Sequence, residues 1–193
     1  MKDDVYIVGL CGSLAPDSGT RVIVREALAA AERAGAETTL VDLREYDLPT
    51  FEPHRPDAGD APELRRHVDR ADGVVLGTPM YHGTFSSPLK TALDYCGADE
   101  FEETTVGLAA VAGGSFPTPA LEHLRSVARA LGAWTLPHQV GIPDSHERFA
   151  DGELIDDDLR ERTRRLGREL VDYAGVTSYP EVTEKPVEAQ STP

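Results

Sequence analysis

Three loops that each follow a short apolar run constrain the fold of this chain more than any other feature of its sequence. The apolar runs are residues 5–10, 74–77 and 106–112, and the loops after them are residues 12–21, 78–83 and 113–115. Continuous apolar runs are typical of strands in a sheet that is covered on both faces. Because open α/β sheets bind ligands beyond the carboxyl ends of their strands, we expect the three loops to form one binding site.

Predicted strands and helices alternate along most of the 193 residues. The predicted strands are residues 5–10, 37–42, 73–77, 105–112 and 134–140. The predicted helices are residues 18–34, 62–70, a third from Pro88, 119–131 and 156–174. Ser86-Ser87 before Pro88 gives the third helix an N-cap and a proline in its first turn. This alternation predicts right-handed crossovers and a parallel sheet, in either the order 2-1-3-4-5 or a Rossmann order.

The charge balance argues against a nucleic-acid partner. The chain has 19 basic and 34 acidic residues and a net charge of −15, and no basic face is visible. Its lysines are Lys2, Lys90 and Lys185, the other basic residues being arginine. Acid excess with scarce lysine is typical of proteins that face molar salt, where repulsion is screened over about 3 Å. We therefore predict a halophilic source, such as a halophilic archaeon; the alternative is an ordinary acidic cytosolic protein.

Location and cysteine usage give further expectations. No apolar run approaches the roughly 20 residues of a membrane span, and the N-terminus leads directly into a strand, so we expect a cytoplasmic protein without a membrane partner. Residues 1–175 should form one domain, and the Pro-, Glu- and Thr-rich residues 176–193 a disordered tail. Cys11 and Cys96 show no metal-ligand spacing, which predicts two buried, inert thiols and no metal site.

The first loop offers the hydroxyl groups of Ser13, Ser18 and Thr20 just before a predicted helix. It matches neither the Gly-x-Gly-x-x-Gly fingerprint nor a Walker A loop. Hydroxyls together with the free N–H groups of a first helical turn suit a phosphate monoester. The alternative is that Ser18 is only an N-cap. Arg21 lies ten residues past Cys11, too far to close a thiol-phosphatase loop around an anion.

The other two loops suit a flat heterocycle. Pro79-Met80-Tyr81-His82-Gly83 combines a rigid entry, an aromatic ring and a glycine that permits close backbone approach. A run of backbone N–H groups would match the edge of an isoalloxazine, and Tyr81 and His82 are weak candidates for proton donors. Gly113-Gly114-Ser115 lacks bulky side chains where a ring would lie close. Ordinary packing and an ordinary turn are the alternatives.

These stretches, of which Ala71–Gly83 is the most specific, resemble the NADPH-dependent FMN reductase family, and the match continues through Ser86–Tyr95. That family is flavodoxin-like and has quinone, azo and chromate reductases among its relatives. The resemblance covers about residues 5–140 and implies a three-layer α/β sandwich with the strand order 2-1-3-4-5. It also implies bound FMN, NAD(P)H as co-substrate, and a homodimer or dimer of dimers.

Carried over by residue, the resemblance implies that Ser13, Ser18 and Thr20 hold the FMN phosphate. The isoalloxazine would be lined by Pro79, Met80, Tyr81, His82, Gly83, Gly113, Gly114 and Ser115. The chain departs from the family where many members have arginine at Ala15, glutamate at Met80, asparagine at His82 and asparagine at Thr91.

The implied activity is a two-electron oxidoreductase in which FMN takes hydride from NAD(P)H and passes electrons to a flavin, quinone, azo or similar acceptor. Such chemistry belongs to the cofactor and needs no side-chain nucleophile. The rival readings are a non-catalytic, flavodoxin-like electron carrier and a flavin-binding module without turnover. Carriers bury the ring between aromatic residues, and only Tyr81, Phe85 and Phe116 are available in these loops, which favours an enzyme.

Overall fold

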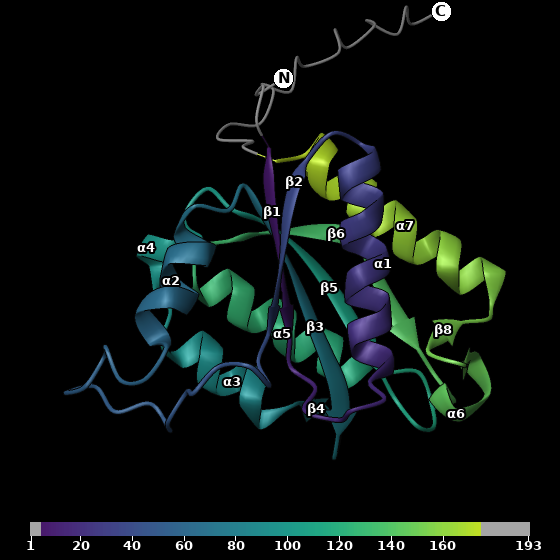
Figure 1. The fold of residues 1–193 in the computed structure, drawn as a ribbon, viewed down its shortest axis with the longest axis horizontal. Coiled ribbons are helices and arrows are strands. Elements are labelled where there is room, and N and C mark those ends of the chain that lie inside the picture. The colour runs from purple at the N-terminus through teal and green to yellow at the C-terminus, as the bar shows by residue number, and fades with distance from the viewer. Residues whose placement is uncertain (1–4, 175–193) are drawn as a thin grey trace, which may run out of the picture.

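A computed structural model describes residues 5–174 and shows a parallel sheet between two layers of helices (Figure 1). Five parallel strands lie in the order β2-β1-β3-β5-β6. Their bounds are β1 Tyr6–Cys11, β2 Glu37–Asp42, β3 Gly73–Tyr81, β5 Thr105–Val111 and β6 Trp134–Ile142. Counted as parallel strands, this is the flavodoxin-like order 2-1-3-4-5, and the Rossmann order is excluded. The tail predicted over residues 176–193 lies outside the described residues.

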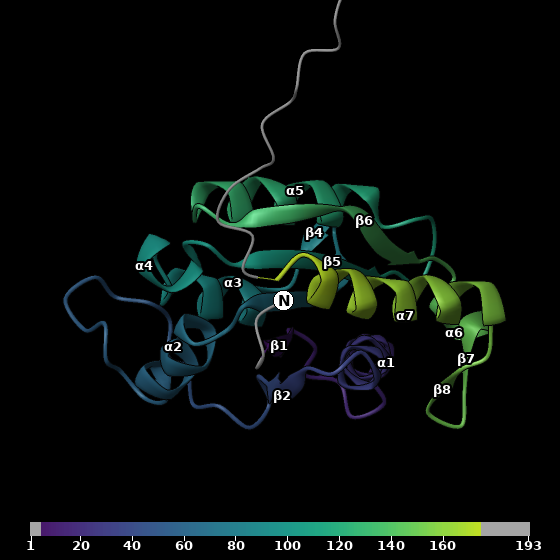
Figure 2. The same ribbon diagram turned by 90° about the horizontal axis from the view of Figure 1, so that it is seen from above.

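Helices cover both faces of the sheet (Figure 2). On one face lie α1 (Gly19–Arg33) and α7 (Asp157–Asp172), and their apolar sides pack with Ile7, Val75 and Ala109 of the sheet. The other face carries α2 (Ala61–Asp69), α3 (Ser87–Asp94) and α5 (Thr118–Ala130). The three inner strands β1, β3 and β5 are therefore buried on both sides over nearly their whole length, which is why their sequences are continuous apolar runs.

Two glycines allow α1 to lie directly on the strands that it covers. A Cβ atom added at Gly77 would lie 2.2 Å from Cγ2 of Val24, and one at Gly9 would lie 2.6 Å from Cγ1 of the same valine. Any larger residue at these positions would push the helix outward. This close packing holds the N-terminus of α1 beside the carboxyl ends of β1 and β3.

The second predicted loop is in fact a β-hairpin, which corrects the expected end of the third strand at Gly77. β3 continues to Tyr81 and pairs antiparallel with β4 (Thr84–Phe85) across the two-residue turn His82-Gly83. Both turn residues have positive φ, 51° and 80°, as a tight hairpin requires. Pro79 is tolerated within β3 because β1 ends at the Cys11–Gly77 pair, so Pro79 lies beyond that neighbouring strand.

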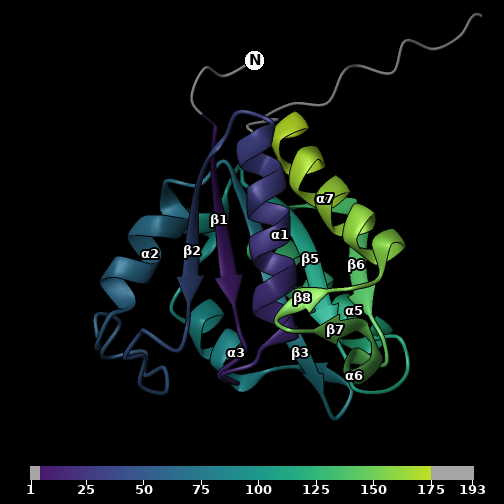
Figure 3. The ribbon, with the colours of Figure 1, turned by 45° about the vertical axis from the view of Figure 1, so that its right-hand side comes forward.

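The segment after β6 contains elements for which the sequence analysis made no prediction. It forms a short helix, α6 (Ser145–Arg148), and a hairpin of β7 (Phe149–Ala150) and β8 (Glu153–Leu154). This arm lies beside the first turns of α1 (Figure 3). A four-residue helix, α4 (Ala98–Phe101), follows α3. None of the helices within residues 5–174 has the length and apolar character needed to cross a membrane.

Both cysteines are free and buried, as predicted. Cys96 lies just beyond the end of α3 rather than within it. Burial is the main cause that raises the pKa of Cys11, and it raises the pKa of Cys96 to about 12. Because the thiolate is the reactive form, both thiols are unreactive at neutral pH.

Candidate functional site

Backbone hydrogen bonds bring the three loops to the same edge of the sheet. The N–H of Gly12 donates to the carbonyl of Gly77 at 2.8 Å, which joins the first loop to β3. The N–H of Asp144 donates to the carbonyl of Gly114 at 2.7 Å, which holds the third loop against the end of β6. We call residues 12–20, 78–83 and 113–116 the carboxyl-edge site.

The predicted hydroxyl groups of the first loop lie around the start of α1. Ser13, Ser18 and Thr20 are all nearly buried. Oγ of Ser18 accepts a hydrogen bond from the N–H of Arg21 at 3.1 Å, so Ser18 is the N-cap of α1. Oγ of Ser13 accepts from the N–H of Ala15 at 3.4 Å. Each serine therefore has its oxygen fixed by a backbone donor while its hydroxyl hydrogen can still donate to a ligand.

Arg21 holds this loop from beneath. Its Nη1 donates to the carbonyl of Pro16 at 3.0 Å and its Nη2 to the carbonyl of Ala15 at 3.1 Å. The described chain contains no cis peptide bond, and in a trans peptide the C=O and N–H point in opposite directions. With the Pro16 carbonyl directed at Arg21, the N–H of Asp17 therefore points away from Arg21.

A buried ion-pair cluster completes this support. Nε of Arg21 lies 2.7 Å from Oδ2 of Asp42, and Nη2 of Arg44 lies 2.6 Å from the same oxygen. Burial alone would raise the pKa of Asp42, but the hydrogen bonds from Arg44 and Arg21 together outweigh it, and the pKa of that carboxyl is lowered. Two guanidinium groups and one carboxylate leave a net positive charge under a loop that lacks arginine at Ala15.

Sequence reasoning missed Arg21, Asp42 and Arg44 as parts of the site. Arg21 and Asp42 are 21 residues apart, and only the strand order brings the end of β2 beside the first turn of α1. The available signal was positional: Asp42 ends a strand next to β1, and Arg21 lies in the first turn of the helix after β1.

The hairpin presents its tip to solvent. Tyr81 and His82 are exposed, whereas Pro79 is buried within the sheet and Met80 packs partly against the core. The hydroxyl of Thr84 on β4 lies 2.9 Å from Nδ1 of His123, which ties the hairpin to α5. Among the residues predicted to line the ring in the second loop, Tyr81 and His82 therefore have the most accessible side chains.

Open space lies above the third loop. A Cβ atom added at Gly113 or Gly114 would meet no atom within 4 Å, so the packing of the described chain does not require glycine there. Each loop also contributes one exposed apolar side chain: Leu14 is 55% exposed, Tyr81 56% and Phe116 45%. The carboxyl-edge site thus combines the hydroxyl groups of the first loop, the open space above Gly113 and Gly114, and three exposed apolar side chains.

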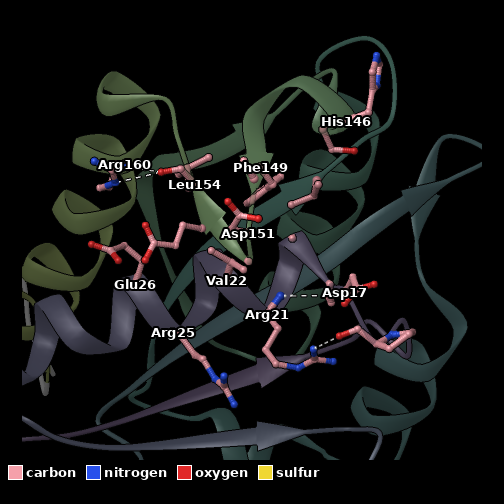
Figure 4. Close-up of a pocket in the computed structure, with 18 of the residues that line it drawn as sticks. Asp17, Arg21, Val22, Arg25, Glu26, His146, Phe149, Asp151, Leu154 and Arg160 are labelled. Atoms are coloured by element: carbon pink, nitrogen blue, oxygen red, sulfur yellow. Dashed lines mark hydrogen bonds between the residues drawn. The ribbon is translucent and has the colours of Figure 1, made fainter.

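A cavity of about 1260 Å³ lies next to this site, between α1 and the α6–β7–β8 arm (Figure 4). Among the predicted cofactor-binding residues only Ser18 lines it. Asp151 and Glu26 flank the cavity, whereas the Arg25 side chain extends to the other side of α1 (Figure 4). Arg160 and Arg164 also line the cavity, so its charge is mixed, and neither Ser13 nor Thr20 reaches it.

The chain is similar to known proteins in sequence and in fold. The sequence model of the family described as NADPH-dependent FMN reductase matches residues 5–147. The chain is 34% identical over 122 residues to the FMN-dependent NADPH-azoreductase of Staphylococcus aureus strain USA300. That alignment covers 61% of this chain and 64% of the relative, so the chain spans less than two thirds of the relative's length.

Solved structures of other proteins share the fold. The apo form of the NADH:FMN oxidoreductase EMOB superposes with a TM-score of 0.73 at 20% identity, covering 91% of this chain and 92% of that one. The NAD(P)H:(acceptor) oxidoreductase FerB from Paracoccus denitrificans gives 0.74 at 20% identity, covering 88% and 96%. At this identity the likeness supports the flavodoxin-like fold.

Proposed function

The chain belongs to the NADPH-dependent FMN reductase family, and from this premise we propose that it is an FMN-containing, NAD(P)H-dependent oxidoreductase. Bound FMN would supply the chemistry, accepting hydride from NAD(P)H and passing electrons to a flavin, quinone, azo or similar acceptor. The observation that carries the proposal is the carboxyl-edge site. There a hydroxyl-rich loop at the N-terminus of α1 shares one edge of the sheet with the open space above Gly113 and Gly114. The protein's part is to bind and orient FMN and to shield it from water.

Ser13, Ser18 and Thr20 would hold the phosphate, with the first-turn N–H groups of α1. The helix itself offers no acceptor for the earliest of these N–H groups, and its dipole favours an anion there. No acidic residue lies in the first turn of α1, and the one carboxylate of the loop is the exposed Asp17 just before it. The net positive charge of Arg21, Asp42 and Arg44 acts in the same direction. These residues therefore fit a phosphate dianion.

Pro79, Met80, Tyr81, His82 and Gly83 would line one edge of the isoalloxazine, and Gly113, Gly114 and Ser115 another. The open space above the two glycines leaves room for a flat ring. Leu14, Tyr81 and Phe116 would exclude water from it. The positive end of α3 follows the hairpin and would favour negative charge on the ring by about 0.3–1 kcal/mol. Neither Tyr81 nor His82 is required as a catalytic group.

The protein would act as a homodimer, or a dimer of dimers, in the cytoplasm. Phe85 is only half-buried and pairs with Met80 in the hairpin, next to the exposed Tyr81. A second copy that covers this region would shield the flavin. Light scattering should give a particle larger than the 20.9 kDa chain at working salt; a mass of one chain would contradict the dimer.

Turnover separates the enzyme from the electron carrier. FMN-loaded protein should consume NADPH continuously when free FMN or a quinone is supplied as acceptor, with many NADPH molecules oxidised per chain. A carrier would hold the flavin equally well but would need a separate reductase to receive electrons. NADPH consumption no faster than that of the same flavin and acceptor without protein would contradict the proposal.

A further inference from the structure

Ser86 stands at the N-cap of α3, yet its side chain does not cap the helix. Its hydroxyl instead donates to the carbonyl of Gly12, 2.7 Å away and 74 residues earlier in the chain. Ser86 is buried, and the bond crosses from the hairpin side of the site to the first loop. The sequence had indicated only the capping role for the Ser86-Ser87 pair.

The backbone around Ser86 is fixed by a second hydroxyl. The N–H of Ser86 donates to Oγ1 of Thr78 at 2.9 Å, and Oγ1 of Thr78 donates to the carbonyl of Pro79 at 2.8 Å. Thr78 is fully buried at the base of the hairpin. Ser86 is thus anchored to the hairpin through its N–H and to the first loop through its hydroxyl.

Gly12 is held on both sides of its backbone by this part of the chain. Its N–H donates to the carbonyl of Gly77 at 2.8 Å, and its carbonyl accepts from Ser86. A Cβ atom at Gly12 would lie 2.7 Å from Cβ of Leu89 and 2.8 Å from Oγ of Ser86. The packing leaves no room for the first loop to move toward α3. The bond from Ser86 opposes movement in the other direction.

We propose that Ser86 is a positioning residue that fixes the distance between the phosphate loop and the hairpin. The proposal rests on the proposed function, in which FMN contacts both. A ligand that reaches two fixed half-sites gains from their preorganisation, whereas a ligand that reaches only one does not. Ser86 therefore sets how much tighter FMN binds than riboflavin, without contacting either.

The test compares Ser86→Ala with Ser87→Ala, a matched control because Ser87 is the exposed neighbour. Flavin-free protein is titrated with FMN and with riboflavin. In Ser86→Ala the Kd for FMN should rise about 3- to 10-fold, the effect of one lost hydrogen bond, while the Kd for riboflavin changes less than about 2-fold. Ser87→Ala should change neither. Equal weakening of both flavins, or no change in FMN binding, would overturn the proposal.

Amide hydrogen exchange on the flavin-free protein tests the bridge independently of any ligand. In Ser86→Ala, exchange should quicken both in the first loop, including the Gly12 amide, and in the hairpin; in Ser87→Ala it should not. If the wild-type protein binds no flavin, the proposed function fails, and amide exchange alone then tests whether Ser86 holds the first loop to the hairpin. Faster exchange in both segments supports it, and unchanged exchange in the first loop overturns it.

Discussion

Replacing Arg21 by methionine should destabilise the folded protein strongly, even without a ligand. The substitution keeps an unbranched chain of similar length but removes three hydrogen bonds, to Asp42, Pro16 and Ala15. The Arg21 and Asp42 side chains are only 8% and 3% exposed, so water does not easily replace the lost donor to Asp42. The first loop would lose its support from below.

The size of the effect follows from what remains paired. Removing one partner of a buried ion pair costs about 3–5 kcal/mol when the other charge is left alone. Asp42 keeps Arg44 as a partner at 2.6 Å, which lowers that cost, and the carbonyls of the exposed residues Ala15 and Pro16 can regain hydrogen bonds from water. We expect the free energy of unfolding to fall by about 3 kcal/mol in Arg21→Met. Arg21→Lys should lose about half of that, because lysine cannot reach both carbonyls as a fork.

Urea denaturation of flavin-free protein measures this, with Arg25→Met as the control. Arg25 lies one turn further along α1, is exposed, and should change the stability by no more than about 0.5 kcal/mol. The lowered pKa of Asp42 means that its stabilising contribution is present above its ordinary value of 3.8 and is lost as pH falls through the lower, folded value. The difference between wild type and Arg21→Met should therefore shrink under acid conditions. Equal midpoints for Arg21→Met and Arg25→Met at neutral pH would refute the reasoning.

Three further expectations follow from the packing and the charge. Gly114→Ala should leave the melting temperature nearly unchanged yet weaken FMN binding, whereas Gly12→Ala should lower the stability by about 1–3 kcal/mol through overpacking against Leu89; similar melts for both variants would contradict this. Burial raises the pKa of Cys96 from 9.0 to about 12, so the protonated thiol contributes its full stability below pH 9, and this contribution is lost as the pH rises toward 12. Cys96→Ala should flatten that decline in stability, and an unaltered pH profile of stability would disprove it. With a net charge of −15, stability and turnover should both rise between about 0.1 M and 1 M KCl as the Debye length falls from about 10 Å to about 3 Å, and flat melts and rates would remove the case for salt adaptation.

Local sequence patterns predicted the covered parallel sheet, whereas they left two strand orders open and only the family resemblance implied the observed one. Apolar runs between helical segments define a covered parallel sheet, and the helix starting after Ser18 was correct to within a residue. The third strand was predicted to end at Gly77, where its apolar run ends. The strand continues because its pairing with β1 ends at Gly77 while its pairing with β5 runs two residues further to Pro79, which no local pattern reveals.

The two hairpins were not predicted from the sequence, for a different reason. Asp151-Gly152 connects β7 to β8, and Asp-Gly is a strong hairpin signal, but strands of two residues carry too little apolar alternation to be recognised. His82-Gly83 is a less usual turn pair. Contacts across the fold, such as Arg21 with Asp42 and Ser86 with Gly12, were beyond prediction because they depend on which strand ends become neighbours.

The most direct test of the carboxyl-edge site is an equilibrium titration of flavin-free wild-type and Ser18→Ala protein with FMN and with riboflavin. Wild-type protein should bind one FMN per chain, more tightly than riboflavin. Ser18→Ala should weaken FMN binding by about 0.5–3 kcal/mol, because a hydrogen bond to a charged phosphate is lost, and should leave riboflavin binding nearly unchanged. Absence of FMN binding in the wild type, or equal losses for both flavins in the variant, would contradict the assignment of the phosphate to this loop.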